Sequence, residues 1–267
     1  MQSLWMLFAS FLFAAMGVCV KLASDMFSTS EIVMYRGIVG VTVLLILIRL
    51  QGGTLKTRFA MGHLWRSIVG VVSLWLWFFS IAKLPLATAM ALNYLSPIWI
   101  AVWLFAHGWW QAKNQVAWPL LVAVAMSFVG VVLLLQPAFQ SDQLVYALIA
   151  IFSSILTAVA YMQVRKLGLA GEPENRVVFY FAVSNVVAGL LGTFAEAGGG
   201  PAVFHSLNTG HGFLLLLGIG LFATAAQISM TRAYRLGNTL VVANLQYTGI
   251  VYSSIWGVHV FSDSVDW

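Results

Sequence analysis

Polar side chains recur at helical spacing inside long apolar stretches, and they are the residues of this chain that could bind another molecule. Three groups fall at i, i+3 or i+4, and i+7, which is one face of a helix. Their members are Ser73, Trp77 and Ser80; Ser154, Thr157 and Tyr161; and Thr224, Gln227 and Thr231. A lone hydroxyl in an apolar helix usually bonds to its own backbone or packs between helices. Several polar faces together are instead expected to line one central cavity that offers hydrogen bonds.

Two further apolar stretches carry amide and phenol groups. Asn93 and Tyr94 stand just before Pro97, and Asn244 and Tyr247 occupy a later stretch. Pro97 removes a backbone donor and frees a carbonyl near Asn93. This break either exposes polar backbone to a bound molecule or only bends the helix, and the sequence leaves both interpretations open.

Arg36 is the charged residue of the second stretch that most needs an explanation. Glu31 stands near the entrance of that stretch, where a structural charge is expected, and Arg36 lies over a turn deeper. A charge at membrane depth needs a partner or water. We therefore expect Arg36 to anchor a carboxylate of a bound molecule or to hold a gate. Trp75, Trp77 and Phe78 would flank the otherwise uncharged cavity, which suits a neutral or zwitterionic molecule with an apolar part.

Nine apolar stretches must position these side chains, and each is long enough to cross a bilayer. They are Leu4–Leu22, Ile32–Leu50, Leu64–Ala82, Leu86–Trp110, Val116–Leu135, Leu144–Val164, Val177–Ala195, Phe213–Ala233 and Leu240–Phe261. Of the 267 residues 61% are hydrophobic and 8% are charged, whereas a soluble domain carries about 25% charged residues. Lipid cannot hydrate backbone groups, so the stretches are predicted to be helices of an all-α, multi-pass membrane protein.

Basic residues alternate between the connections of these stretches. One side would hold ten of them, namely Arg49, Lys56, Arg58, Arg66, Lys113, Arg165, Lys166, Arg176, Arg232 and Arg235. The other side would hold only Lys21 and Lys83. Basic connections stay in the cytoplasm, so the N-terminus is predicted to be cytoplasmic. The net charge of +5 follows from this topology, and we predict no nucleic-acid partner.

Motifs of enzymes and metal sites are missing from the sequence. It contains no Cys-x-x-Cys, His-Glu-x-x-His, Walker loop or Gly-x-Ser-x-Gly. The five histidines are scattered, mostly at stretch ends or in connections. His205 and His211 could form a metal or proton site, although a solvated loop is the stronger expectation. We predict no enzyme, no catalytic residue, no metal and no cofactor.

A weak internal similarity divides the chain into residues 1–137 and 138–267. A shift of 144 pairs Lys21 with Arg165, and a shift of 153 pairs Tyr94 with Tyr247. Each half would contain five stretches. Because five is an odd number, the second half would begin on the opposite side of the membrane from the first, as in inverted-repeat transporters. No stretch after Phe261 matches the fifth. We expect two inverted five-helix repeats, nine visible spans and a chain that stops before its tenth helix.

Three places carry a family pattern. They are Lys83–Pro97 at the entry to the fourth stretch, Ala233–Asn238 leading into Ala243–Tyr247 at the ninth, and the acidic-then-arginine pair Glu31 and Arg36. These runs resemble the EamA-domain members of the drug/metabolite transporter superfamily. The resemblance implies a ten-helix inverted-repeat carrier that moves a small metabolite, driven by a gradient and without ATP.

We therefore expect a secondary transporter, or permease, of the bacterial cytoplasmic membrane that works by alternating access. Its substrate would be a small neutral or zwitterionic metabolite, such as an amino acid or a vitamin-like compound. The residues expected to bind it are Arg36, Trp77, Asn93, Tyr94, Ser154, Tyr161, Gln227, Thr231, Asn244 and Tyr247. The expected partners are this substrate and the lipid bilayer, with a proton or another coupling ion and a homodimer left open. The alternatives are a membrane enzyme acting on a lipid-like substrate and a non-transporting scaffold.

Overall fold

Helices make up nearly all of the protein that the computed structural model describes. The described residues are 2–110, 118, 122, 125–126, 129–130, 143–198, 204–205 and 210–261. The predicted fifth stretch, Val116–Leu135, and the boundary between residues 137 and 138 lie almost entirely outside them. The described part contains no strand, in agreement with the predicted all-α class.

Eleven helices are defined in this part of the chain. They are η1 (Gln2–Leu4), α1 (Trp5–Ala23), α2 (Thr29–Leu50), α3 (Ala60–Lys83), α4 (Leu86–Asn93), α5 (Ser96–Trp110), α7 (Leu144–Leu169), α8 (Glu174–Glu196), α9 (Gly210–Leu236), α10 (Thr239–Leu245) and α11 (Thr248–Phe261). By length and composition, seven helical segments of the described residues could cross a membrane. The chain is thus a multi-pass membrane protein, and the full set of nine spans stays a prediction.

Glu31 is buried in the first turn of helix α2, where it caps the start of the helix. The Ser28 hydroxyl accepts a hydrogen bond from the Glu31 backbone N–H, and the Glu31 carboxylate accepts one from the Ser28 N–H. This capping box satisfies two backbone donors that the first turn would leave unpaired. Glu31 therefore has the structural role expected at the entrance of that helix.

The fourth and ninth stretches are each broken in two. Helix α4 ends at Asn93 and α5 begins at Ser96, because Pro97 has no N–H to continue the ladder. The ninth stretch, predicted as one helix from Leu240 to Phe261, is wrong in that respect, because it divides at Gln246 into α10 and α11. A shift of 153 residues pairs these two breaks. The second break has no proline, so only the internal similarity could have indicated it.

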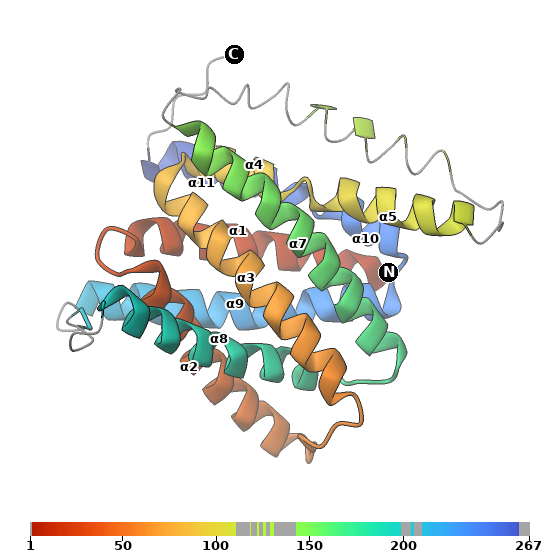
Figure 1. Cartoon of the computed structure of the whole chain (residues 1–267), viewed down its shortest axis with the longest axis horizontal. Coiled ribbons are helices and arrows are strands. Elements are labelled where there is room, and N and C mark those ends of the chain that lie inside the picture. The colour runs from red at the N-terminus through yellow and green to blue at the C-terminus, as the bar shows by residue number, and fades with distance from the viewer. Residues whose placement is uncertain are drawn as a thin grey trace.

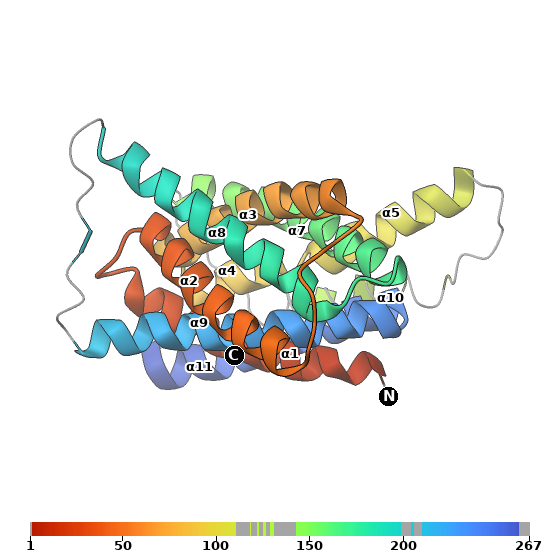
Figure 2. The same cartoon turned by 90° about the horizontal axis from the view of Figure 1, so that it is seen from below.

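The helices pack in pairs across the two halves of the sequence. Helix α1 lies along α9, α3 along α7, and α2 along α8 (Figure 1). Seen from below, α3 and α7 lie on one side and α1, α9 and α11 on the other, with α2 and α8 running obliquely across the bundle (Figure 2). Small residues allow the closest approach, since Gly37 of α2 and Gly189 of α8 each face the backbone of the other helix.

The connections gather at two ends of the molecule. At one end, Asn175 donates to the Gln51 side chain, which joins the first turn of α8 to the C-terminal end of α2. At the other end, the Lys21 ammonium donates to the Leu84 carbonyl, and Ser30 is hydrogen bonded to Glu196. Two of the connections that the basic residues assign to one side, α2–α3 and α7–α8, are therefore next to one another in space.

Candidate functional site

A buried cavity lies where α1, α3, α4, α7, α8 and α9 meet. Its walls are Phe13, Arg66, Gly70, Ser73, Leu74, Trp77, Asn93, Thr157, Ala160, Tyr161, Phe181 and Gln227. Its volume is about 40 Å³, which holds a few water molecules, whereas small-molecule sites measure about 300–1,000 Å³. The cavity is therefore closed to a metabolite in this structure, and one could enter only if helices moved apart.

A second, smaller cavity adjoins the first. It has a volume of about 10 Å³ and is lined in part by Arg36, Asn185 and Thr224. Phe181 and Gln227 belong to the walls of both cavities. These two side chains therefore form the partition between a chamber with Arg66 and a chamber with Arg36.

Hydrogen bonds tie three helices together on one wall of the first cavity. The hydroxyls of Ser73 on α3 and Thr157 on α7 lie 2.6 Å apart. The Asn93 amide, in the last turn of α4, donates to the Ser153 hydroxyl at 3.2 Å. The side chain of Asn93, the last residue of α4, therefore holds this helix against α7. Any movement of α4 relative to α7 must break this hydrogen bond.

Two arginines enter this region without an acidic partner. Arg66 is 2% exposed and Arg36 is 4% exposed, and their guanidinium carbons lie 3.6 and 5.3 Å from the centroid of the Phe181 ring. Arg66 donates one hydrogen bond to the Gln227 side-chain oxygen at 3.3 Å. Neither arginine takes part in an ion pair within the described residues, and Nε of both is without a hydrogen-bond partner there.

Stacking on Phe181 does not balance the burial of these charges. A cation–π contact stabilises by up to about 2 kcal/mol, whereas removing an ion from water costs several kcal/mol. The carboxylates of the described residues lie at the two ends. Glu31 pairs with His205, Glu174 with Arg235, and Glu172 with His63 and Arg176. Glu196 is hydrogen bonded to Ser30, and Asp25 is exposed in the α1–α2 turn. The site therefore carries net positive charge at membrane depth.

Five of the ten predicted binding residues line the two cavities. They are Arg36, Trp77, Asn93, Tyr161 and Gln227. Trp77 presents a buried indole N–H that has no partner among the described residues. Whether these side chains contact a substrate stays a prediction.

The other five predicted residues lie outside both cavity walls. They are Tyr94, Ser154, Thr231, Asn244 and Tyr247. Ser154 accepts a hydrogen bond from the Trp99 indole at 2.9 Å, and the Tyr94 hydroxyl packs onto the backbone of Gly249. In this conformation, neither Tyr94 nor Tyr247 borders either cavity, and the Tyr247 hydroxyl is buried without a hydrogen-bond partner among the described residues.

Arg66, Phe181 and Asn185 are the site residues that sequence reasoning missed. The third stretch was predicted to begin at Leu64, which put Arg66 at its entrance among the basic residues that report topology. Helix α3 begins four residues earlier, so Arg66 lies roughly 9 Å inside it. Asn185 is fully buried in α8 with both amide atoms unpartnered, and a polar residue inside an apolar helix was the signal for it.

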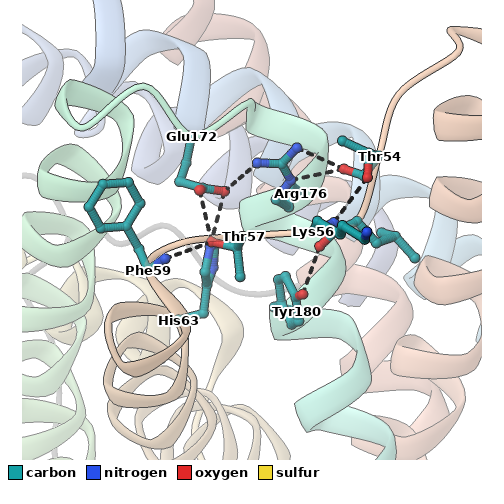
Figure 3. Close-up of polar contacts among 9 residues, drawn as sticks. Thr54, Lys56, Thr57, Phe59, His63, Glu172, Arg176 and Tyr180 are labelled. Carbon is teal, nitrogen blue, oxygen red and sulfur yellow. Dashed lines mark hydrogen bonds and ion pairs between the residues drawn. The ribbon is translucent and has the colours of Figure 1, made fainter.

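A second polar cluster closes one end of the molecule, and Figure 3 shows it around Glu172. The Glu172 carboxylate accepts from Thr57 at 2.8 Å and from Arg176 at 3.1 Å, and it lies 3.2 Å from His63 Nε2. Arg176 also donates twice to the Thr54 carbonyl. This Glu172 cluster (Thr54, Thr57, His63, Glu172, Arg176 and Tyr180) therefore fastens the α2–α3 loop and the start of α3 to the α7–α8 turn and α8.

The cluster keeps Glu172 ionised. Burial alone would raise the pKa of this carboxyl, but the hydrogen bonds from Thr57, Arg176 and His63 outweigh burial, and the pKa lies below its ordinary value of 4.5. His205 at the opposite end binds Glu31, with Nδ1 2.7 Å from the carboxylate. Among the described residues, no group of three side chains is placed to hold a metal ion.

Sites formed by broken membrane helices where two halves of a chain meet are typical of secondary transporters. Residues 1–136 match the EamA-like transporter family. The chain belongs to this family, as its resemblance to the drug/metabolite transporter superfamily predicted.

Named transporters are similar to nearly the whole chain. The pseudopaline exporter CntI of Pseudomonas aeruginosa is 31% identical over 261 residues, which cover 97% of this chain and 87% of the exporter. A riboflavin transporter of Vibrio cholerae is 23% identical over 97% of this chain and 84% of its own length. A solved crystal structure matches 99% of this chain and 91% of its own with a TM-score of 0.76 at 16% identity, which supports the fold alone.

Proposed function

We propose that the protein is a secondary transporter of the bacterial cytoplasmic membrane that carries a small metabolite by alternating access. The observation that carries this proposal is the small buried cavity between the helices. Its wall contains side chains from both halves of the chain, and one of them is Asn93 at the end of the broken helix α4. The alternative functions, a membrane enzyme or a scaffold, would not explain why Arg36 and Arg66 lie beside such a cavity without acidic partners in the described residues. The names of the relatives agree with transport.

The packing supports two inverted repeats, residues 1–137 and 138–267, of a ten-helix arrangement. In such a repeat, α7, α8 and α9 would be the equivalents of α1, α2 and α3. The contact of α1 with α9 would then be equivalent to the contact of α7 with α3, and the contact of α2 with α8 would be its own equivalent. All three contacts are present. The paired breaks in the fourth and ninth stretches have the same symmetry. Rocking of these two units about the cavity would expose it to each side in turn.

The substrate we propose carries a carboxylate. Sequence reasoning suggested a neutral or zwitterionic metabolite, such as an amino acid or a vitamin-like compound. Of these, a zwitterion fits better, because Arg36 and Arg66 lack acidic partners in the described residues. Trp77, Phe13 and Phe181 would contact its apolar part.

Transport in sealed proteoliposomes tests the proposal. Labelled amino acids and riboflavin should be screened for counterflow with and without a proton gradient, beside protein-free liposomes. We expect at least one compound to exchange, and Asn93→Ala to slow it roughly tenfold while the variant folds normally, because this change removes the donor to Ser153. Failure of folded, inserted protein to move any compound would contradict the proposal, and light scattering of the same preparation tests for a homodimer.

Orientation in the membrane gives a separate prediction. In a Cys19→Ser background, an impermeant thiol reagent added to intact cells should label Asp25→Cys and spare Thr54→Cys. Both positions are exposed, one in the α1–α2 turn and one in the α2–α3 loop at the other end. The basic residues place the α2–α3 loop in the cytoplasm. The reverse labelling pattern would invert the proposed topology.

A further inference from the structure

We propose that the two cavities are halves of one anion site, in which Arg36 and Arg66 each bind a carboxylate of a substrate with net negative charge. This inference rests on the proposed function, keeps its carboxylate-bearing substrate, and replaces the zwitterion by a substrate with net negative charge. It assigns a recognition role to Arg66 and Asn185, and it separates a dicarboxylate from an ordinary zwitterionic amino acid.

Charge balance is the first argument. Both guanidinium groups are almost fully buried, and Arg36 Nε, Arg66 Nε and Arg66 Nη1 have no hydrogen-bond partner in the described structure. A zwitterion has no net charge, so it would leave the sum of two positive charges unchanged. A dianion cancels both, and its oxygens supply the acceptors that the free N–H groups lack.

Geometry is the second argument. Both guanidinium carbons face the Phe181 ring, at 3.6 and 5.3 Å from its centroid, so they are at most about 9 Å apart, the sum of these distances. That separation is within reach of two carboxylates on a short carbon chain. The ring and Gln227 stand between the two chambers, and their displacement would join the chambers into one.

Amide groups complete the site. The side-chain oxygen of Gln227 now accepts a hydrogen bond from Arg66, which is the contact that a carboxylate oxygen would make in its place. Asn185 faces the Arg36 chamber with its amide nitrogen and oxygen both buried and unpartnered in the described structure. Released Gln227 and free Asn185 offer neutral donors to the same anion, whereas Thr224 keeps its bond to the Gly220 carbonyl.

Binding to the purified protein tests the inference with three compounds of one skeleton. Glutamine, glutamate and N-acetylglutamate carry net charges of zero, minus one and minus two. We expect the unfolding temperature in detergent to rise most with N-acetylglutamate and least with glutamine, at equal concentration and ionic strength. Citrate and succinate serve as further dianionic or trianionic probes.

Arginine variants identify the site. Arg36→Gln and Arg66→Gln should each raise the half-maximal concentration of N-acetylglutamate roughly tenfold or more, and the double variant should lose the response. Arg232→Gln is the matched control, because Arg232 is exposed and stacks on Trp5. Without ligand, Arg36→Gln and Arg66→Gln should unfold at the same temperature as the unaltered protein or higher, since each removes an uncompensated buried charge.

Several outcomes would overturn the anion site. One is stabilisation by glutamine as large as that by every anion, and another is an anion response that survives in the double variant. Ligand-free arginine variants that unfold well below the unaltered protein would point to a structural role instead. Transport of riboflavin or glutamine that the double variant retains would reject the anion site while the proposed transport function stands. Absence of all transport rejects that function, and the binding series still decides the site.

Discussion

Glu172→Ala is expected to open the end of the protein at which the α2–α3 loop meets α8. The carboxylate holds Thr57, His63 and Arg176 together, and its side chain is 4% exposed. Removing one partner of a buried ion pair costs about 3–5 kcal/mol. If the Glu172 cluster exists only in the closed conformation, its loss shifts the ratio of closed to open protein by roughly a hundredfold or more.

Thiol labelling measures this opening. A cysteine at Ser73, in the cavity wall, should react faster with a small polar reagent in inside-out vesicles once Glu172 is alanine, in a Cys19→Ser background. Glu174→Ala is the matched control, because Glu174 pairs with Arg235 within the second half of the chain and is partly exposed. Equal labelling of Ser73→Cys with and without Glu172 would show that the cluster does not close the cavity.

Acid should act on the same cluster with a definite sign. The pKa of Glu172 is lowered in the folded protein, so the stabilisation from its carboxylate is complete above the ordinary pKa of 4.5. It is lost only as the pH falls below that value and through the lowered pKa. The ratio of Ser73→Cys labelling between the Glu172→Ala protein and the protein with Glu172 should therefore stay constant from pH 8 to about 5, and it should fall towards one only in stronger acid.

The membrane-spanning helices could be predicted because lipid allows few alternatives. A helix is the form in which an apolar segment satisfies its own backbone, so composition and length largely decide the class. The residues at which the helices begin and end were less predictable. The third stretch starts at Ala60 rather than Leu64, because His63 and the residues before it are too weakly apolar to extend the pattern. A break at Pro97 follows from covalent chemistry, whereas the break at Gln246 has no proline to predict it.

The candidate site was predictable only in part, because helical spacing does not give the rotation of a helix about its axis. Ser154 and Thr157 are three residues apart, so they point about 60° from each other. That angle separates Thr157 in the cavity wall from Ser154 beneath the Trp99 indole. Arg66 was missed for another reason, since four residues of error at the start of α3 moved its charge from the interior to the membrane surface.

Gly189→Ala is expected to prevent correct packing of α2 on α8. A Cβ at position 189 would lie 2.5 Å from the Met34 nitrogen and 2.7 Å from its Cα, and backbone atoms cannot move aside as a flexible side chain does. Alanine gains about 1 kcal/mol of helix propensity over glycine, whereas overpacking a tight core costs about 1–3 kcal/mol or more. We expect the cost of the clash to exceed the gain in propensity. The helices cannot easily move apart here, because Gly37 of α2 is packed equally tightly, with the Val186 nitrogen 2.7 Å from the ideal Cβ position of Gly37.

Gly218→Ala is the control for this change and should behave in the opposite way. Gly218 lies inside helix α9, and the nearest atom to its ideal Cβ is the Cys19 sulfur at 3.6 Å, an ordinary van der Waals contact. Its replacement therefore keeps the propensity gain without a clash. We expect Gly189→Ala to lower the yield of monodisperse protein and its unfolding temperature in detergent, while Gly218→Ala leaves both unchanged or higher. Equal stability of the two variants would mean that α2 and α8 lie farther apart than the structure places them. Phe181 and Asn185 of α8 line the cavities beside Arg66 and Arg36, so the geometry of the proposed site would then also be wrong.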